Sequence, residues 1–124
     1  MKNVVKTDKA PGAIGPYSQG INVGDMYFFS GQIPLDPETG NMPEGIEAQA
    51  HQALKNVQGL LESQGLDFSN VIKTTVFLDN MADFNTVNEI YATYFVEPFP
   101  ARSAVEVGSL PKGALIEVEV IACK

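Results

Sequence analysis

The chain has 124 residues, of which 44% are hydrophobic and 19% charged, and its net charge is −7 at pH 7. This size and composition predict a single globular domain over residues 1–124 that can bury a stable core without disulfides or metal. The eight Lys and Arg residues form no basic cluster, which argues against nucleic acid as a partner, because nucleic-acid-binding proteins gain much of their affinity by neutralising phosphates.

The first predicted elements are a loop and a hairpin. Residues 10–20 hold three Gly and two Pro, a composition typical of a loop with unusual backbone angles. Residues 21–23 and 26–30 then predict two strands of a β-hairpin, joined by a short turn at Gly24-Asp25. The following segment is predicted to be irregular because it contains Pro34, Pro37, Gly40 and Pro43.

Two helices and a strand are predicted in the middle of the chain. The helix over 46–64 has apolar residues at helical spacing, and Gly65 is well placed to end it; the apolar residues are Ile46, Ala50, Leu54, Val57 and Leu61. Residues 71–78 are rich in β-branched side chains and predict a strand. A second helix is predicted from an Asn80 cap to Pro98, with an apolar stripe of Phe84, Val87, Tyr91 and Tyr94.

The last predicted elements are strands over 101–107 and 115–123, joined by the sequence GSLPKG. Because side chains alternate along a strand, one face of the final strand is plainly core: Ile116, Val118, Val120 and Ala122. The other face mixes apolar and acidic residues: Leu115, Glu117, Glu119 and Ile121. We expect this mixed face to be at least partly covered, for example by another subunit.

Pairing the two final strands as a hairpin brings Arg102 opposite Glu119 and Ala104 opposite Glu117. Arg102 and Glu117 then become diagonal neighbours on one face. This register is an assumption, since a slip of one residue would reverse the faces. Two interpretations follow: a structural cross-strand salt bridge, which the residues alone favour, or an arginine fork that binds a carboxylate ligand beside a proton-handling Glu117.

Other site chemistries have little support in the sequence. His51 is the only histidine, lies on the first helix at the edge of its solvated face, and has no Cys or His near it at metal-ligand spacing. His51 has no Ser or Cys motif beside it, which argues against a histidine-containing triad, and no phosphate-binding glycine motif is present. The single Cys123 and the absence of a signal-peptide or membrane-spanning run lead us to expect a cytoplasmic location.

Two further positions are weaker candidates for a site. Tyr17, in the Gly/Pro-rich loop, is either a packing residue or presents its hydroxyl to a cleft. Ser30-Gly31 follows a strand, where a glycine lets a ligand approach the backbone closely.

Taken together, several segments resemble the RidA family, also called the YjgF family. The matching segments are IGPYSQG at 14–20, SGQIP at 30–34, VIKTTVFLDNMADFNTVNEIY at 71–91 and FPARSAVEVGSLPKGALIEVEVIA at 99–122. They span nearly the whole chain in the expected order. The resemblance implies an α+β fold similar to chorismate mutase, with about six strands, two helices on one sheet face, and a homotrimer whose sites lie between subunits.

The implied activity is hydrolysis of reactive 2-imino acids, and of the enamines that tautomerise to them, to 2-oxo acids and ammonia, with no cofactor and no metal. By resemblance, Arg102 binds the substrate carboxylate and Glu117 orients or activates water. Tyr17 lines the cleft with them. The other substrate-binding residues implied are Ser30, Gly31, Asn88 and Ala104.

The chain departs from the family pattern at Ala104, where many members have a cysteine. A mechanism that needs this thiol is not available here, whereas a role for the backbone carbonyl is retained. Two alternative functions stay open: a metabolite-binding regulatory trimer that acts on a partner protein, and a translation inhibitor or endoribonuclease, against which the net charge of −7 weighs.

Overall fold

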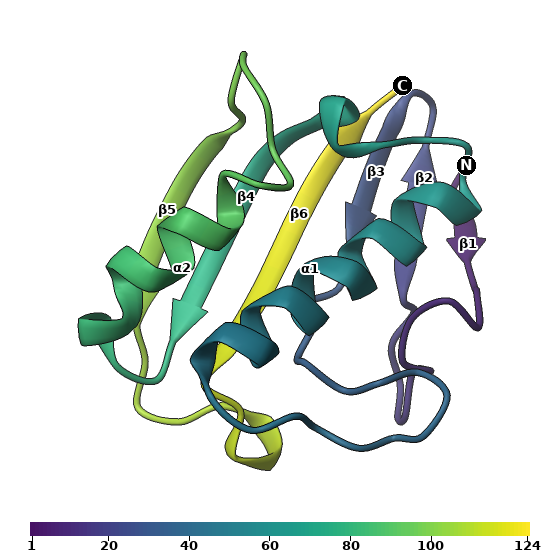
Figure 1. Ribbon diagram of the computed structural model, residues 1–124. Helices are drawn as coiled ribbons and strands as arrows, with labels where there is room; N and C mark the ends of the chain where they lie inside the picture. The colour runs from purple at the N-terminus through teal and green to yellow at the C-terminus, as the bar shows by residue number, and fades with distance from the viewer.

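The computed structural model describes residues 1–124 as an α+β fold, with six strands in one sheet and two helices (Figure 1). The strands are β1 (Asn3–Val5), β2 (Gly20–Val23), β3 (Met26–Phe29), β4 (Val71–Leu78), β5 (Ala101–Glu106) and β6 (Ile116–Cys123). The helices are α1 (Ile46–Ser63) and α2 (Phe84–Tyr91). Short 3₁₀ turns lie at Phe68–Asn70, Met81–Asp83 and Pro111–Gly113.

The strand order β1-β2-β3-β6-β4-β5 corrects the predicted C-terminal hairpin. β4 lies between β5 and β6, pairing in parallel with β5 and antiparallel with β6. The prediction was wrong because the connection over 107–115 is longer than a hairpin turn, which usually has about two to five residues. This connection is long enough to pass across the end of β4.

The predicted β2–β3 hairpin is confirmed. Val23 pairs with Met26, and Gly24 takes the positive φ of 58° that this tight turn requires. β1 was not predicted, because three residues are too few to show an alternating pattern; it pairs with β2 at the sheet edge.

Both helices lie on the same face of the sheet (Figure 1). The predicted core face of β6 is confirmed, since its four residues are at most 1% exposed: Ile116, Val118, Val120 and Ala122. They pack with α1 residues such as Leu54, Val57 and Leu61 in one hydrophobic cluster. Burial of this apolar surface is the main favourable term in folding.

The helix boundaries agree with the prediction for α1 and differ for α2. α1 ends at Ser63, and Gly65 has the positive φ of 71° expected just after a helix. α2 is shorter than predicted and ends at Tyr91, well before Pro98. Its end coincides with tighter turns in which the Thr93 backbone N–H and hydroxyl both donate to the Ile90 carbonyl, at 2.9 and 2.6 Å. Asn80 caps the 3₁₀ turn that leads into α2.

The irregular segment after β3 is held on α1 by a buried amide. Asn56 is 1% exposed, and its Nδ2 donates to the carbonyls of Ile33 at 3.1 Å and Leu35 at 2.8 Å. Sequence patterns did not reveal this anchor. The apolar residues around Asn56 follow helical spacing and predict the helix, but nothing in that pattern indicates that the Asn56 side chain is buried and hydrogen-bonded to another segment.

We expect Asn56→Ala to lower the free energy of unfolding by about 2–4 kcal/mol, because two carbonyls lose their donor without regaining water. Chemical denaturation measures this change. The control is Gln58→Ala on the same helix, which should alter stability by less than about 0.5 kcal/mol because Gln58 bonds only to the exposed Glu62. Equal effects of the two substitutions would contradict the anchoring role.

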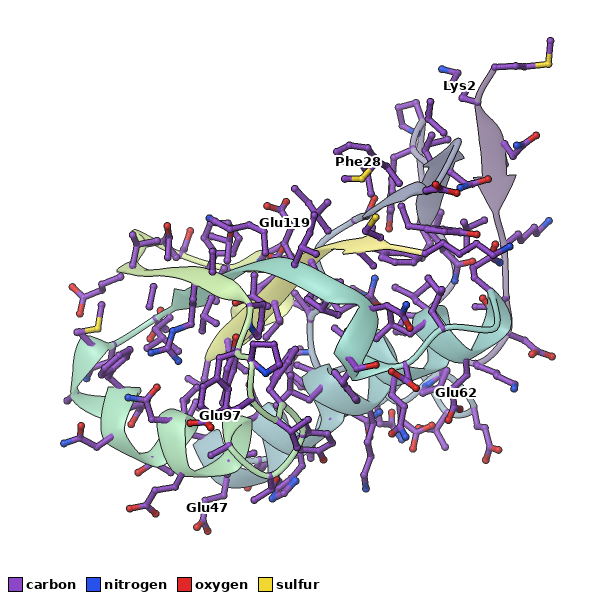
Figure 2. All side chains as sticks on the ribbon, turned by 90° about the horizontal axis from the view of Figure 1, so that it is seen from above. Lys2, Phe28, Glu47, Glu62, Glu97 and Glu119 are labelled. Atoms are coloured by element: carbon purple, nitrogen blue, oxygen red, sulfur yellow. The ribbon has the colours of Figure 1, made fainter.

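The second face of the sheet has no helix on it. Phe28 and Glu119 project from this face, on the opposite side from the helices (Figure 2). Large apolar side chains are exposed there, including Val4 at 66%, Phe28 at 46% and Val105 at 42%. Neither helix is both long and apolar enough to span a membrane.

Candidate functional site

A cavity of about 570 Å³ opens between the Gly/Pro-rich loop, the segment after β3 and the 3₁₀ turn before β6. Four residues singled out from the sequence line it together: Tyr17, Ser30, Gly31 and Glu117. They come from three separate parts of the chain, and the pairing of β3 with β6 brings two of these parts together. We call this the Glu117 cavity.

Glu117 lies against the backbone of Gly31. A Cβ at position 31 would overlap the Glu117 carboxylate, so any residue larger than glycine requires this side chain to move from its present place. The sequence suggested that Gly31 allows a ligand to approach, and the group that approaches is Glu117 itself. Burial raises the pKa of the Glu117 carboxyl group, and the negative charge of nearby Glu119 raises it further. A raised pKa makes this carboxyl group better suited to accept and return a proton during a reaction.

The loop that carries Tyr17 is fixed by Gln19, which is 4% exposed. The Gln19 Oε1 accepts from the Thr7 backbone N–H at 2.7 Å, and its Nε2 donates to the carbonyls of Thr7 at 2.9 Å and Pro11 at 2.8 Å. Sequence reasoning missed Gln19, since a single amide inside a loop gives no periodic signal. Its bonds hold the loop so that Tyr17 stays at the cavity.

Ser30 fastens the same loop to the end of β3. Its hydroxyl donates to the Ser18 carbonyl at 2.6 Å, and its backbone N–H donates to the Gln19 carbonyl at 2.9 Å. The Ser30 oxygen therefore remains available to a ligand only as an acceptor, unless this bond opens.

Arg102 lies elsewhere, on the helix-covered side of the edge strand β5. Its Nη1 donates to the Asn88 Oδ1 on α2 at 2.6 Å. The guanidinium carbon is 4.8 Å from the ring centroid of Tyr91 and 5.3 Å from that of Phe84. A second cavity, of about 380 Å³, adjoins this cluster and is lined by Tyr91, Ala92, Phe99, Pro100 and Arg102.

Arg102 and Glu117 lie on opposite faces of the sheet within one chain. Arg102 pairs with Thr74, whose hydroxyl bonds to Tyr91 on the helix side, whereas Glu117 alternates with buried core residues and faces away from the helices. The predicted diagonal contact of Arg102 with Glu117 is therefore wrong, and so is a salt bridge across a pair formed by the two final strands. The cause is the inserted strand β4, which removes the direct pairing of β5 with β6.

Ala104 pairs with Val76 of β4, not with Glu117 as predicted. It lies two residues beyond Arg102 on the same face and packs, partly buried, against the core.

His51 takes no part in either cavity. It is exposed on α1, and its Nδ1 lies 2.8 Å from the Tyr94 hydroxyl. Its predicted place on a solvated face is confirmed. No group of three or more His, Cys, Asp or Glu side chains lies close enough together to hold a metal ion.

Comparison with known proteins adds a family to this geometry. A profile of the family described as endoribonuclease L-PSP matches residues 7–124. The human 2-iminobutanoate/2-iminopropanoate deaminase is 52% identical over 123 residues, which are 98% of this chain and 90% of the human protein. The chain belongs to the RidA/YjgF family.

Two solved structures show how closely this RidA-family chain follows its relatives in three dimensions. The YjgF gene product of E. coli has a TM-score of 0.94 and 48% identity, with 98% of each chain covered. E. coli TdcF, whose crystal structure contains bound serine, has a TM-score of 0.94 and 42% identity, again with 98% of each chain covered. The order and arrangement of elements described above are therefore those of RidA-family proteins.

The chemistry of this RidA-family chain is divided between two groups of residues. The Glu117 cavity offers a carboxyl group of raised pKa together with the hydroxyl groups of Tyr17 and Ser30. The Arg102 cluster offers a cation whose remaining N–H groups can bind an anion in a forked arrangement. Together they could bind a small carboxylate and move a proton on it.

Proposed function

We propose that this chain is a deaminase that hydrolyses 2-imino acids, and the enamines that tautomerise to them, to 2-oxo acids and ammonia. The observation that carries the proposal is the 52% identity to the human 2-iminobutanoate/2-iminopropanoate deaminase over 98% of the chain. The Arg102 cluster and the Glu117 cavity support it, because a carboxylate clamp and a proton-handling carboxyl group are what such a substrate requires.

The reaction begins when water attacks the carbon of the C=N bond. A C–O bond forms, the electrons of the C=N double bond pass to nitrogen, and nitrogen takes a proton. The tetrahedral amino alcohol then loses ammonia as the C–N bond breaks, its hydroxyl proton leaves, and the carbonyl of the 2-oxo acid forms. Glu117 passes one proton from the attacking water to the nitrogen, and later passes the hydroxyl proton of the amino alcohol to the same nitrogen, which departs as ammonia. Because an imine carbon is already electrophilic, positioning and proton transfer are sufficient assistance.

We propose further that three copies assemble through the helix-free sheet faces, as in a chorismate-mutase-like fold, so that Arg102 of one subunit meets the Glu117 cavity of the next. Two features support this arrangement. Arg102 and Glu117 cannot meet within one chain, and the helix-free face exposes large apolar residues such as Phe28 and Val105. Light scattering after size-exclusion chromatography measures the mass; a monomer in solution would contradict this arrangement.

The deaminase proposal is tested by coupling the purified chain to a threonine dehydratase, which releases the imine. An amine nucleophile in the mixture traps imine that has not been hydrolysed, so a deaminase lowers the amount of trapped product. We expect the decrease to grow with the concentration of the chain. If the chain adds nothing to the uncatalysed rate of hydrolysis, the proposed function is wrong.

The family description also names an endoribonuclease, which is the competing hypothesis. Against it stand the net charge of −7 and the absence of a basic cluster. RNA cleavage by a nuclease-free preparation, lost on Arg102→Ala, would favour this hypothesis instead.

A substitution at Gly31 tests the arrangement of the Glu117 cavity. We expect Gly31→Ala to lower kcat/KM by about 10- to 100-fold, because the added Cβ displaces the Glu117 carboxylate, and small misplacements of reacting groups cost rates of this order. Steady-state kinetics in the coupled assay measure the effect. The control is Gly108→Ala, where an added Cβ meets nothing within 4 Å. Equal activity of the two variants would show that the Gly31–Glu117 contact is unimportant.

A further inference from the structure

The ring of Tyr91 forms the floor under the Arg102 guanidinium group. The guanidinium carbon lies 4.8 Å from the ring centroid, within the range of a cation–π interaction. The Asn88 amide oxygen accepts one N–H from the edge of the same group at 2.6 Å. The Phe84 ring also lies near the group, with its centroid 5.3 Å from the guanidinium carbon, and the N–H groups not bonded to Asn88 remain free for a ligand.

Tyr91 is itself held from two sides. Its side chain is 6% exposed, and its hydroxyl lies 2.8 Å from the Oγ1 of Thr74, which is fully buried on β4. Its ring stacks on Phe95, with centroids 4.2 Å apart and an interplanar angle of 24°. The ring therefore has little freedom to turn and presents a fixed surface to the guanidinium group.

The Tyr91 hydroxyl is neutral at neutral pH, and burial raises its pKa further above the ordinary value near 10. A neutral phenol does not compete with a substrate carboxylate for the guanidinium charge. Tyr91 thus supports Arg102 without neutralising it.

We propose that Tyr91, anchored by Thr74, is a positioning residue that fixes the plane in which Arg102 binds the substrate carboxylate. This inference rests on the proposed function, since it assigns Tyr91 a part in binding that substrate. Arginine binds carboxylates through two parallel N–H groups, so the orientation of its plane decides whether both bonds form.

The carboxylate is not among the atoms whose bonds change in the hydrolysis. A residue that orients Arg102 therefore contributes the same binding free energy in the ground state and in the transition state. Loss of such binding raises KM and leaves kcat nearly unchanged. Substitution of a residue with only a structural role would instead lower thermal stability. It would weaken the binding of charged and uncharged ligands to the same extent.

The test compares Tyr91→Leu, Tyr91→Phe and the control Tyr94→Leu. Tyr94 belongs to the same aromatic group and is a matched control, because its ring packs on His51 and Phe68 and the Arg102 guanidinium lies over Tyr91 and Phe84 instead. Two measurements are made on each variant: kcat and KM in the dehydratase-coupled assay, and calorimetric dissociation constants for 2-oxobutanoate and its uncharged methyl ester.

We expect Tyr91→Leu to raise KM and the dissociation constant of 2-oxobutanoate by about tenfold, the size of a partly desolvated cation–π interaction. The change in kcat should stay within about threefold, and the affinity for the methyl ester should not change. Tyr91→Phe keeps the ring and should restore most of the affinity. Tyr94→Leu should behave as wild type in every ligand measurement.

The inference is overturned if Tyr91→Leu binds 2-oxobutanoate as wild type does, or if the affinities for acid and ester fall equally. If Tyr91→Leu does not fold, Thr74→Val replaces it, since this change keeps the ring but removes its hydrogen-bond partner. It should weaken binding of 2-oxobutanoate by about two- to fivefold, and no weakening would overturn the inference. Failure of the proposed function is distinguishable, because wild type would then show no deaminase activity at all.

Discussion

Arg102→Ala is expected to lower kcat/KM for 2-iminobutanoate by at least about 100-fold while leaving the fold intact. Hydrogen bonds to charged groups contribute about 1.5–3 kcal/mol each, and a forked clamp makes two of them. Arg102 is exposed at the edge of the sheet, so its removal opens no cavity in the core. The coupled assay measures the loss of activity, and circular dichroism confirms that the fold is retained.

Arg102→Lys should recover only part of this loss, because lysine supplies a point charge without the planar fork. The control is Lys55→Ala on the exposed side of α1, which removes the same charge from a residue that lines neither cavity and should leave kcat/KM unchanged. If Arg102→Lys is fully active, the forked clamp is ruled out.

Mixing two inactive variants tests whether Arg102 and Glu117 act across subunits. In trimers reassembled from equal amounts of Arg102→Ala and Glu117→Gln chains, about a quarter of the sites contain both native residues if each site is shared by two subunits. Activity should therefore return to about a quarter of the wild-type level. If each site belonged to one chain, mixing would restore nothing.

Elements with a strong local pattern could be predicted from the sequence. The helix at 46–64 and the strand at 71–78 have periodic apolar or β-branched residues, and the turn at Gly24 has a residue suited to its backbone angle. These patterns involve residues only a few positions apart, so they can be interpreted without knowledge of the rest of the fold.

The strand order could not be predicted in the same way. β5 follows α2 and precedes β6 in the chain, yet its only partner is β4, in a parallel pair. The sequence of residues 101–123 does not indicate that β4 lies between the two final strands. The position of β4 depends on how all six strands pack against the helices, which involves residues far away in the chain. The error in order became an error in the site, since it placed Arg102 and Glu117 on one face.

The candidate site was predicted in part. Tyr17, Ser30, Gly31 and Glu117 do lie together, and glycine and proline residues marked the loops that carry the first three. Supporting residues such as Gln19 and Tyr91 were not recognised as part of a site. Gln19 is a lone polar residue in a loop, and Tyr91 follows the apolar stripe of its helix, which is how an ordinary core residue appears.

Glu117→Gln is expected to lower kcat by about 100- to 1000-fold, because the amide cannot take or return the proton that hydrolysis moves. In wild type, the pKa of the Glu117 carboxyl group is raised by burial and by Glu119. Activity should therefore fall on acidification at a pH above the ordinary carboxyl value of about 4.3. The measurement is kcat/KM from pH 4 to 9, with the uncatalysed hydrolysis subtracted at each pH.

Glu119→Gln is the matched variant for this profile. It removes one of the two causes of the raised pKa of Glu117 but keeps the carboxyl group itself, so the acidic limb should move to lower pH while the plateau stays near wild type. An unchanged limb would show that another group controls the profile.

The same carboxyl group links activity to stability, and the sign follows from its raised pKa. The folded state binds the Glu117 proton more tightly than the unfolded state, so the stabilisation is present below about pH 4.3 and is lost as pH rises through the folded-state pKa. At pH 7 the partly buried charge therefore opposes folding, and Glu117→Gln should raise Tm there but not at pH 4. A lower Tm at pH 7 would mean that Glu117 stabilises the fold. The expected result, an inactive and more stable variant, would mean that Glu117 is kept at the cavity for proton transfer in spite of its effect on folding.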